Sequence, residues 1–329
     1  MKRKFMAALM AAAGVLMSAA LCGCGSSEKA ELKFAAGSSA GTYYAYGTQL
    51  AELVSSDMKL NVRETAGSAA NLRLLEEGFV DVAVAQSDII DYNVSSHSNY
   101  SAVASLYTEA VQIVVRGDYD INSVEDLEMV SISVGEEDSG TVTNAEQILN
   151  VYGMSFDDVV IHYMSFSESA DAMRTGTIMG FFVTAGAPTA AIAELAEDMD
   201  IKILSIDQEH MDIIQKMYGG YVSCRIPAGT YKGQNEEVST LGVKAVLLAG
   251  NSVSEETIKT LTEDLFKNAE KLGSYTVTDG AMTVQSAAEG ISIPFHKGAA
   301  SYFESQGVSV SVSDAEDTAS GGVNAGQDD

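Results

Sequence analysis

The chain has 329 residues, 46% of them hydrophobic, and a formal net charge of −27. This charge excludes nucleic acid as a partner, because phosphate backbones are bound through Lys and Arg. Cys224 has no second Cys or His close enough in sequence to indicate a zinc site, and we expect no metal and no cofactor.

Residues 1–23 have the pattern of a secretory signal peptide, with a basic start followed by an apolar run over residues 5–21. A transmembrane helix is the alternative, although the Ala, Gly and Ser content makes this run weakly hydrophobic. The end of the run is similar to a bacterial lipoprotein box, which would leave Cys24 as a lipidated first residue. Cleavage nearby without a lipid is the alternative. Residues 24–31 would then be a flexible tether, and the protein would be exported, either lipid-anchored to the outer face of the bacterial cytoplasmic membrane or periplasmic.

Strands and helices are expected to alternate along the rest of the chain. Strands are predicted at residues 32–36, 60–64, 80–85, 103–106, 111–116, 130–134, 159–164, 178–183 and 201–206. Helices are predicted at residues 43–55, 69–75, 121–127, 143–152, 167–174, 188–196 and over most of 253–306. This rhythm predicts an α/β fold with parallel sheets.

The rhythm restarts after Arg116, which predicts two similar lobes. Lobe 1 would contain residues 32–116 and about 226–309, and lobe 2 residues 117–225. Residues 310–329 are rich in Ser, Asp, Gly and Ala and lack apolar periodicity, so we expect a disordered acidic tail.

Several predicted strands end in turns rich in Gly, Ser and Thr that lead directly into a helix, at residues 37–42, 65–68, 86–88 and 135–141. Such turns place unpaired N–H groups at the positive end of a helix dipole, where anions bind. In open α/β sheets these turns lie together outside the carboxyl ends of the strands. They predict a cleft that holds a small anionic molecule without a cluster of Lys or Arg.

The candidate ligand-binding residues lie in these turns and in the one before Pro188. They are Ser39, Gly41, Thr42, Tyr43, Tyr44, Gly67, Ser68, Gln86, Ser87, Ser139, Gly140, Thr141 and Gly186. No catalytic residues are expected among them.

Each candidate has a structural alternative. The first turn could merely cap its helix, and the second could be a plain turn. Gln86 and Ser87 could bond to the backbone instead of a ligand, and Gly186 could serve tight packing. Tyr43 and Tyr44 are adjacent on a helix and point in different directions, so the sequence leaves open which of them faces the cleft.

Six segments carry a family resemblance: residues 41–44, residues 65–68 with Asn71, residues 86–88, residues 133–141, residues 181–188 and residues 293–299. Their order and spacing, from residue 32 to residue 303, resemble those of the TAXI family. TAXI proteins are solute-binding subunits of tripartite ATP-independent (TRAP) transporters. Two departures are Ala40, where the family usually has Gly, and Lys297, where it usually has Pro; both affect only local loop geometry.

The resemblance implies a two-lobed, type II-like periplasmic-binding-protein fold with the ligand cleft between the lobes. It also implies a fused membrane permease as partner, driven by an ion gradient that is commonly sodium. The implied ligand is a small organic anion or amino acid, such as glutamate, glutamine or a 2-oxoglutarate-like acid, held without a single carboxylate-gripping Arg.

Two other function classes compete with transport. An α/β enzyme that uses the turn at residues 37–42 is disfavoured, because that turn lacks the Lys of a P-loop and the chain has no Gly-x-Ser-x-Gly elbow with a suitable His. We therefore expect the chain not to be an enzyme. A receptor that feeds a membrane sensor instead of a permease stays open.

Overall fold

The computed structural model describes residues 29–93, 99–277 and 282–312. The expected signal peptide and the expected lipidation site Cys24 lie outside the described residues. Among the helices in the described ranges, none combines the length and the apolar character that a membrane crossing requires.

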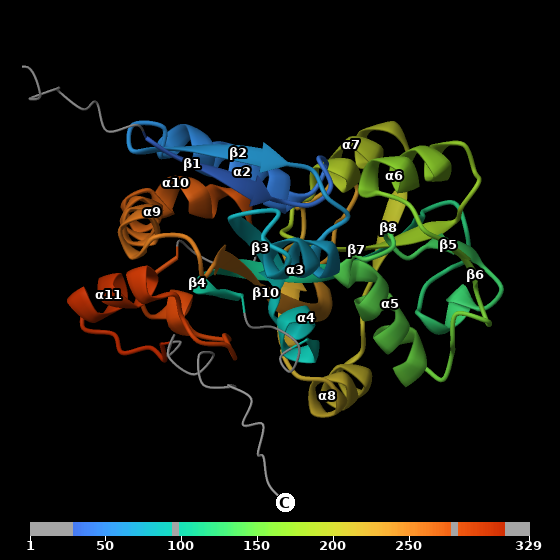
Figure 1. Ribbon diagram of the computed structural model, residues 1–329. Coiled ribbons are helices and arrows are strands. Elements are labelled where there is room, and N and C mark those ends of the chain that lie inside the picture. The colour runs from blue at the N-terminus through green and yellow to red at the C-terminus, as the bar shows by residue number, and fades with distance from the viewer. Residues whose placement is uncertain (1–28, 94–98, 278–281, 313–329) are drawn as a thin grey trace, which may run out of the picture. The chain divides into compact units, whose positions relative to one another are not determined.

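Strands and helices alternate along the first two thirds of the chain, as the sequence predicts (Figure 1). The strands are β1 (Ala30–Ala35), β2 (Met58–Arg63), β3 (Val82–Gln86), β4 (Tyr100–Arg116), β5 (Ser131–Ser133), β6 (Val160–His162), β7 (Gly180–Ala185), β8 (Ile201–Leu204), β9 (Val222–Ile226) and β10 (Val238–Gly250). The α-helices are α2 (Thr42–Leu53), α3 (Ser68–Glu76), α4 (Ser87–Tyr92), α5 (Gly140–Val151), α6 (Phe166–Arg174), α7 (Ala190–Asp198), α8 (Gln208–Met217), α9 (Glu255–Lys267), α10 (Ala269–Leu272) and α11 (Lys297–Ser305). Short 3-10 helices are η1 (Glu125–Leu127), η2 (Gly273–Tyr275) and η3 (Ser286–Ala288).

The described strands form one mixed sheet in the order β2-β1-β3-β10-β4-β7-β5-β6, with β8 paired to β4 and β9 paired to β10. The pairs β1/β3, β5/β6 and β5/β7 are parallel. All pairs made by β4 and β10 are antiparallel. The α/β class is therefore confirmed, whereas the expected parallel pairing holds for these three pairs and not for β4 and β10.

Strand β4 is one strand of 17 residues where the sequence predicts two. Thr108 and Glu109 lie between the two predicted strands, at residues 103–106 and 111–116. Both side chains are nevertheless buried, and the strand continues through them. Strand β10 was not predicted at all, although its apolar residues are visible in the sequence. It crosses the sheet between β3 and β4.

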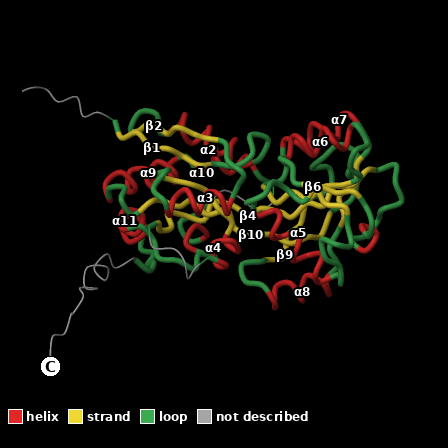
Figure 2. The backbone as a smooth tube through the Cα atoms, turned by 45° about the vertical axis from the view of Figure 1, so that its right-hand side comes forward, coloured by secondary structure: helices red, strands yellow, loops and turns green. Residues whose placement is uncertain are grey.

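The strands β4 and β10 lie between two groups of helices, α9–α11 on one side and α6 and α7 on the other (Figure 2). Ile226, Tyr231 and Val238 pack in one core cluster with Phe181 and Ile192 of β7 and α7. The division into two lobes would thus run through the middle of β4 and β10. This differs from the boundaries expected at Arg116 and residue 226.

The described chain end is paired with the first lobe. The Phe295 N–H donates to the carbonyl of Ser311 over 2.8 Å, and Phe295 also forms a β-bridge with Val312. Ser311 and Val312, which the sequence assigns to the acidic tail, are thus paired with the fold. Residues 313–329 lie outside the described residues.

Helices α9 and α11 pack closely at Gly298. A Cβ atom there would overlap the carbonyl of Glu255 and lie 2.8 Å from the backbone nitrogen of Lys259. Backbone atoms cannot give way, so we expect Gly298→Ala to lower the free energy of unfolding by about 1–3 kcal/mol. Urea titration of the variant and the wild type measures the difference. Gly250→Ala is the control, because its added methyl would meet nothing closer than 3.7 Å. Equal loss in both variants would contradict the close packing at Gly298.

Candidate functional site

A small cavity of about 40 Å³ lies where turns from both lobes meet. Its walls come from the turns after β1, β2 and β5, from the ends of β3 and β7, from the middle of β4 and from the start of α6. The lining residues are Gly37, Ser38, Gly41, Thr42, Tyr43, Ala66, Gly67, Ser68, Gln86, Glu109, Glu136, Ser139, Gly140, Thr141, Phe166, Thr184 and Ala185.

Three helices begin at this cavity. Gly41 and Gly67 are the N-cap residues of α2 and α3, and no side chain caps either helix. Ser139 caps α5, with its hydroxyl accepting from the Val142 N–H over 3.3 Å. The first N–H groups of a helix have no intrahelical partner. Three sets of backbone donors are thereby gathered around one small space.

Glycines allow two of these turns to form. Gly67 has φ +125° and Gly135 has φ +100°, in the region that side chains disfavour. A Cβ atom on Gly135 would also lie 2.9 Å from both the Ser139 hydroxyl and the Cβ of Thr141. The Gly-rich composition of the turns is therefore required by their backbone path.

Most of the candidates named from sequence line the cavity. These are Gly41, Thr42, Tyr43, Gly67, Ser68, Gln86, Ser139, Gly140 and Thr141. Tyr43 lines it and Tyr44 does not, which resolves the direction of the two adjacent rings. That these residues bind a ligand stays a prediction.

Four candidates lie outside the lining. Ser39 is exposed, and its N–H donates to Glu64 Oε1 over 2.7 Å. Tyr44 is half-buried beside the cavity wall. The Ser87 hydroxyl accepts from the Lys244 N–H over 3.0 Å, so its partner is the backbone, the alternative reading given above.

Gly186, the fourth, supports the wall from behind. Its carbonyl accepts from the Thr42 hydroxyl over 3.0 Å, and a Cβ atom would lie 2.6 Å from Thr276 Cγ2. The alternative reading of Gly186 as a packing residue agrees with this geometry.

Sequence reasoning missed five lining side chains: Ser38, Glu109, Glu136, Phe166 and Thr184. Glu109 had a usable signal, because it is a charged residue inside an otherwise apolar run. Ser38 and Glu136 lie in the predicted turns and were passed over for their neighbours. Phe166 and Thr184 carry no local signal.

Asn144 on α5 joins the two lobes behind the cavity. Its Oδ1 accepts from Gln86 Nε2 (3.0 Å) and from the Thr184 hydroxyl (2.8 Å). Its Nδ2 donates to Asp88 Oδ2 (2.6 Å) and to the Tyr221 hydroxyl (2.5 Å). All of these side chains are buried, so the network fixes the position of Gln86 in the cavity wall.

Glu109 is the buried acid of the cavity. It lies on β4 opposite Val243 of β10 and is 1% exposed. Burial raises the pKa of its carboxyl well above the usual value, and nearby Asp88 raises it further, while the hydrogen bond from Tyr43 lowers it. The Tyr43 hydroxyl donates to Glu109 Oε2 over 2.6 Å, and burial holds the pKa of Tyr43 so high that it remains a donor.

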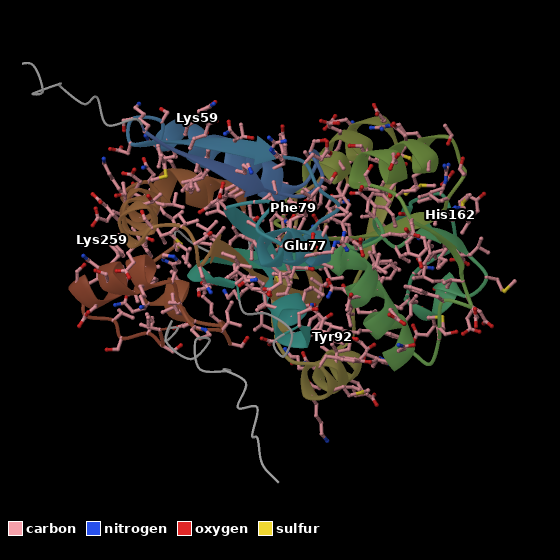
Figure 3. The ribbon with its side chains drawn as sticks, viewed as in Figure 1. Lys59, Glu77, Phe79, Tyr92, His162 and Lys259 are labelled. Atoms are coloured by element: carbon pink, nitrogen blue, oxygen red, sulfur yellow. The ribbon has the colours of Figure 1, made fainter. Side chains whose placement is uncertain are left out.

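A second acid, Glu136, enters the cavity wall from the other lobe. Burial raises its pKa, and the carboxylates of Glu168 and Glu64 raise it further. No Lys or Arg is among the lining residues. Figure 3 shows two of the lysines, Lys59 on β2 and Lys259 on α9, at the outer side of the first lobe.

The Arg73 side chain on α3 is engaged elsewhere. It forms an ion pair with Asp138 at 2.9 Å, and the Ala70 N–H donates to the Asp138 carbonyl at 3.0 Å. These contacts hold α3 against the turn that precedes α5. Within the described ranges, no three His, Cys, Asp or Glu residues come together in a way that could hold a metal ion.

Comparison with known proteins gives a family and a fold. The model of the NMT1-like family matches residues 34–307. A solved structure of a protein from Bordetella bronchiseptica RB50 is 17% identical, with 75% of this chain and 76% of that chain covered and a TM-score of 0.53.

The ligand-binding component of an ABC-type import system from Staphylococcus aureus, solved with zinc bound, is 16% identical. The match covers 74% of this chain and 75% of that chain, with a TM-score of 0.50. At these identities the structures show a shared fold, the two-lobed fold of periplasmic binding proteins expected from sequence.

Asp88 should make stability fall with rising pH. Its pKa is raised from 3.8 to about 7, by burial first and by Asp91 to a smaller extent, against hydrogen bonds from Asn144 and from backbone N–H groups. The folded state then binds more protons than the unfolded state between these values. The free energy of unfolding therefore decreases from about pH 4 to about pH 7 and levels off above.

Asp88→Asn removes the titrating group and keeps an acceptor for Asn144. We expect the variant to lose part of this decrease, measured by urea unfolding at pH 4.5, 5.5, 6.5 and 7.5. Asp157→Asn, at an exposed position, is the control and should keep the wild-type slope. A slope unchanged in Asp88→Asn would show that this carboxyl ionises normally in the fold.

Proposed function

The chain belongs to the NMT1-like family, and we propose that it is an extracytoplasmic solute-binding protein that captures a small solute and delivers it to a membrane permease. The family and the matched import-system component are substrate-binding proteins of transporters rather than enzymes. The expectation that the chain is not an enzyme is confirmed at this level.

One observation carries the proposal. Turns from both lobes supply the walls of one cavity, and three of these turns lead into helices. The first N–H groups of α2 have no side-chain cap, whereas in α3 and α5 the Ala70 and Val142 N–H groups donate to the Asp138 carbonyl and the Ser139 hydroxyl. Concave sites with a few converging polar groups are where small ligands bind. The arrangement offers no nucleophile with an adjacent base, so binding is the chemistry that it supports.

We further propose that the transporter is of the TRAP type and the chain a TAXI subunit. The support is that four of the motif segments behind this resemblance, around Thr42, Ser68, Gln86 and Gly140, all reach the same cavity although they are far apart in sequence. Under this proposal the partner is a permease, Cys24 carries a lipid anchor, and the solute is an organic anion or an amino acid.

Capture would follow from closure of the lobes. The contacts that join them around the cavity include bonds from Thr42 to Gly186, from Gln86 to Asn144 and from Arg73 to Asp138, and the backbone bond from the Ala70 N–H to the Asp138 carbonyl. Each can break without unfolding either lobe, while β4 and β10 remain continuous and act as the hinge. A solute that contacts both lobes binds the closed state better and shifts the population toward it.

The proposal predicts that a solute stabilises the protein. The mature domain, without Cys24, is unfolded and refolded to remove any carried solute. It is then tested by thermal shift against glutamate, glutamine, 2-oxoglutarate, succinate, the other amino acids and diamines. A native-state ligand raises the unfolding midpoint in proportion to RT ln(1 + [L]/Kd). A folded protein that responds to none of these solutes would contradict a solute-binding function for this cavity.

A bulky residue at position 140 should block the site. A Cβ atom on Gly140 would overlap Gln86 Oε1 and lie 3.1 Å from Ile89 Cγ1, across the contact between the lobes. We expect Gly140→Val to weaken binding of the solute identified above at least about tenfold, while the circular dichroism spectrum stays native. Glu146→Ala, exposed on the same helix, is the control and should bind normally. Unchanged affinity in Gly140→Val would remove this turn from the site.

A further inference from the structure

The charges that line the cavity have one sign. Glu109 comes from β4 and Glu136 from the turn before α5, and no lining residue is basic. Arg73, on the neighbouring helix α3, is already paired with Asp138. A solute with two carboxylates would therefore approach two acidic side chains with only backbone N–H groups and hydroxyls to receive it.

Glu109 is held in place as an acceptor. Its Oε2 accepts from the Tyr43 hydroxyl over 2.6 Å, which leaves Oε1 as the oxygen available to a solute. The residue is 1% exposed, so an ionised carboxylate here needs a positive partner or further donors. Among the described side chains, none that lines the cavity could be that positive partner.

A second polar group in the cavity, the Ser38 hydroxyl, has no hydrogen-bond partner among the described residues. Ser38 is 8% exposed and lines the cavity. It lies in the turn before α2, whose first N–H groups have no side-chain cap. One acceptor group on a solute would receive hydrogen bonds from these donors, while the Glu109 carboxylate requires a positively charged group.

Resting on the solute-binding function proposed above, we propose that the solute carries a positively charged nitrogen that pairs with the Glu109 carboxylate. The cavity then selects solutes of zero or positive net charge over dicarboxylates. Glu109 is the residue that determines this specificity, and Tyr43 is a positioning residue that fixes one of its oxygens.

Binding of such a solute changes the number of protons that the protein holds. With the cavity empty, burial raises the pKa of Glu109 and so favours the protonated carboxyl. A cationic group favours the ionised form, so the carboxyl gives its proton to the buffer as the solute binds. Affinity then rises with pH. An anion bound to the protonated carboxyl would show the opposite trend.

Calorimetric titration tests the proposal with L-glutamine, L-arginine and putrescine as neutral and cationic probes, and with L-glutamate, 2-oxoglutarate and succinate as anionic probes. Titrations in phosphate and in Tris at pH 7 give the number of protons released. We expect a neutral or cationic probe to bind most tightly, with a net release of protons to the buffer. This readout needs no variant.

Glu109→Gln should weaken that binding on the order of 30-fold and abolish proton release, because the buried charge pair is lost. Glu146→Gln, exposed on α5, is the matched control and should change neither quantity. Tighter binding of a dicarboxylate, or affinity that falls as pH rises, would overturn the charge preference and leave solute binding intact. Binding of none of the probes by folded wild-type protein would count against both.

Discussion

The antiparallel pairing of β4 with β10 is the interaction on which the rest of the structure depends. The two strands pair from Gly242 opposite Ala110 to Gly250 opposite Tyr100. Beyond Ala110, β4 continues into pairs with β7 and β8. The other edge of β10 pairs with β3 over Ala245–Ala249, and its first residues, Val238–Gly242, pair with β9. One ladder thus belongs to both lobes, and the turns of both lobes are positioned from it. Two register shifts, after Ala245 and after Leu247, interrupt this ladder and give the strands a local freedom to bend.

The same crossing explains why an acid can lie in the centre of the cavity. Glu109 is one of the β4 residues within the shared ladder, opposite Val243, and its side chain reaches the space between the lobes. A charged group there costs desolvation free energy unless it is neutralised or paired. Tyr43, brought to the cavity by α2, supplies one hydrogen bond and leaves the charge unbalanced. The helix N-termini around it favour negative groups, so the cavity presents donors on several sides and an acceptor at its base.

The turns could be predicted from the sequence because their backbone geometry depends on the residues within each turn. Gly67 and Gly135 need positive φ angles, and strand-turn-helix patterns can be read directly from the chain. What could not be predicted depends on long-range pairing. The predicted strands at residues 103–106 and 111–116 leave out Thr108 and Glu109, and only the fold shows that the Tyr43 hydroxyl, 66 positions away, partners Glu109. The antiparallel pairing of β10 was missed for the same reason: the position of β10 between β3 and β4 is decided by packing, and nothing local to residues 238–250 specifies it.

Closure of the lobes brings acidic groups together. A solute of opposite charge offsets the free-energy cost of this approach. The pKa of Glu136 is raised by burial and further by Glu168 of its own lobe and Glu64 of the other. Burial and nearby Asp88 likewise raise the pKa of Glu109. In the closed, empty cavity these carboxyl groups must either take up protons or stay charged in a space with little water, and this opposes closure. A solute that carries a positive nitrogen offsets this cost only in the closed state. It therefore binds the closed state more tightly and shifts the population toward it. An anionic solute would add to this cost and would have to close the lobes through backbone donors alone.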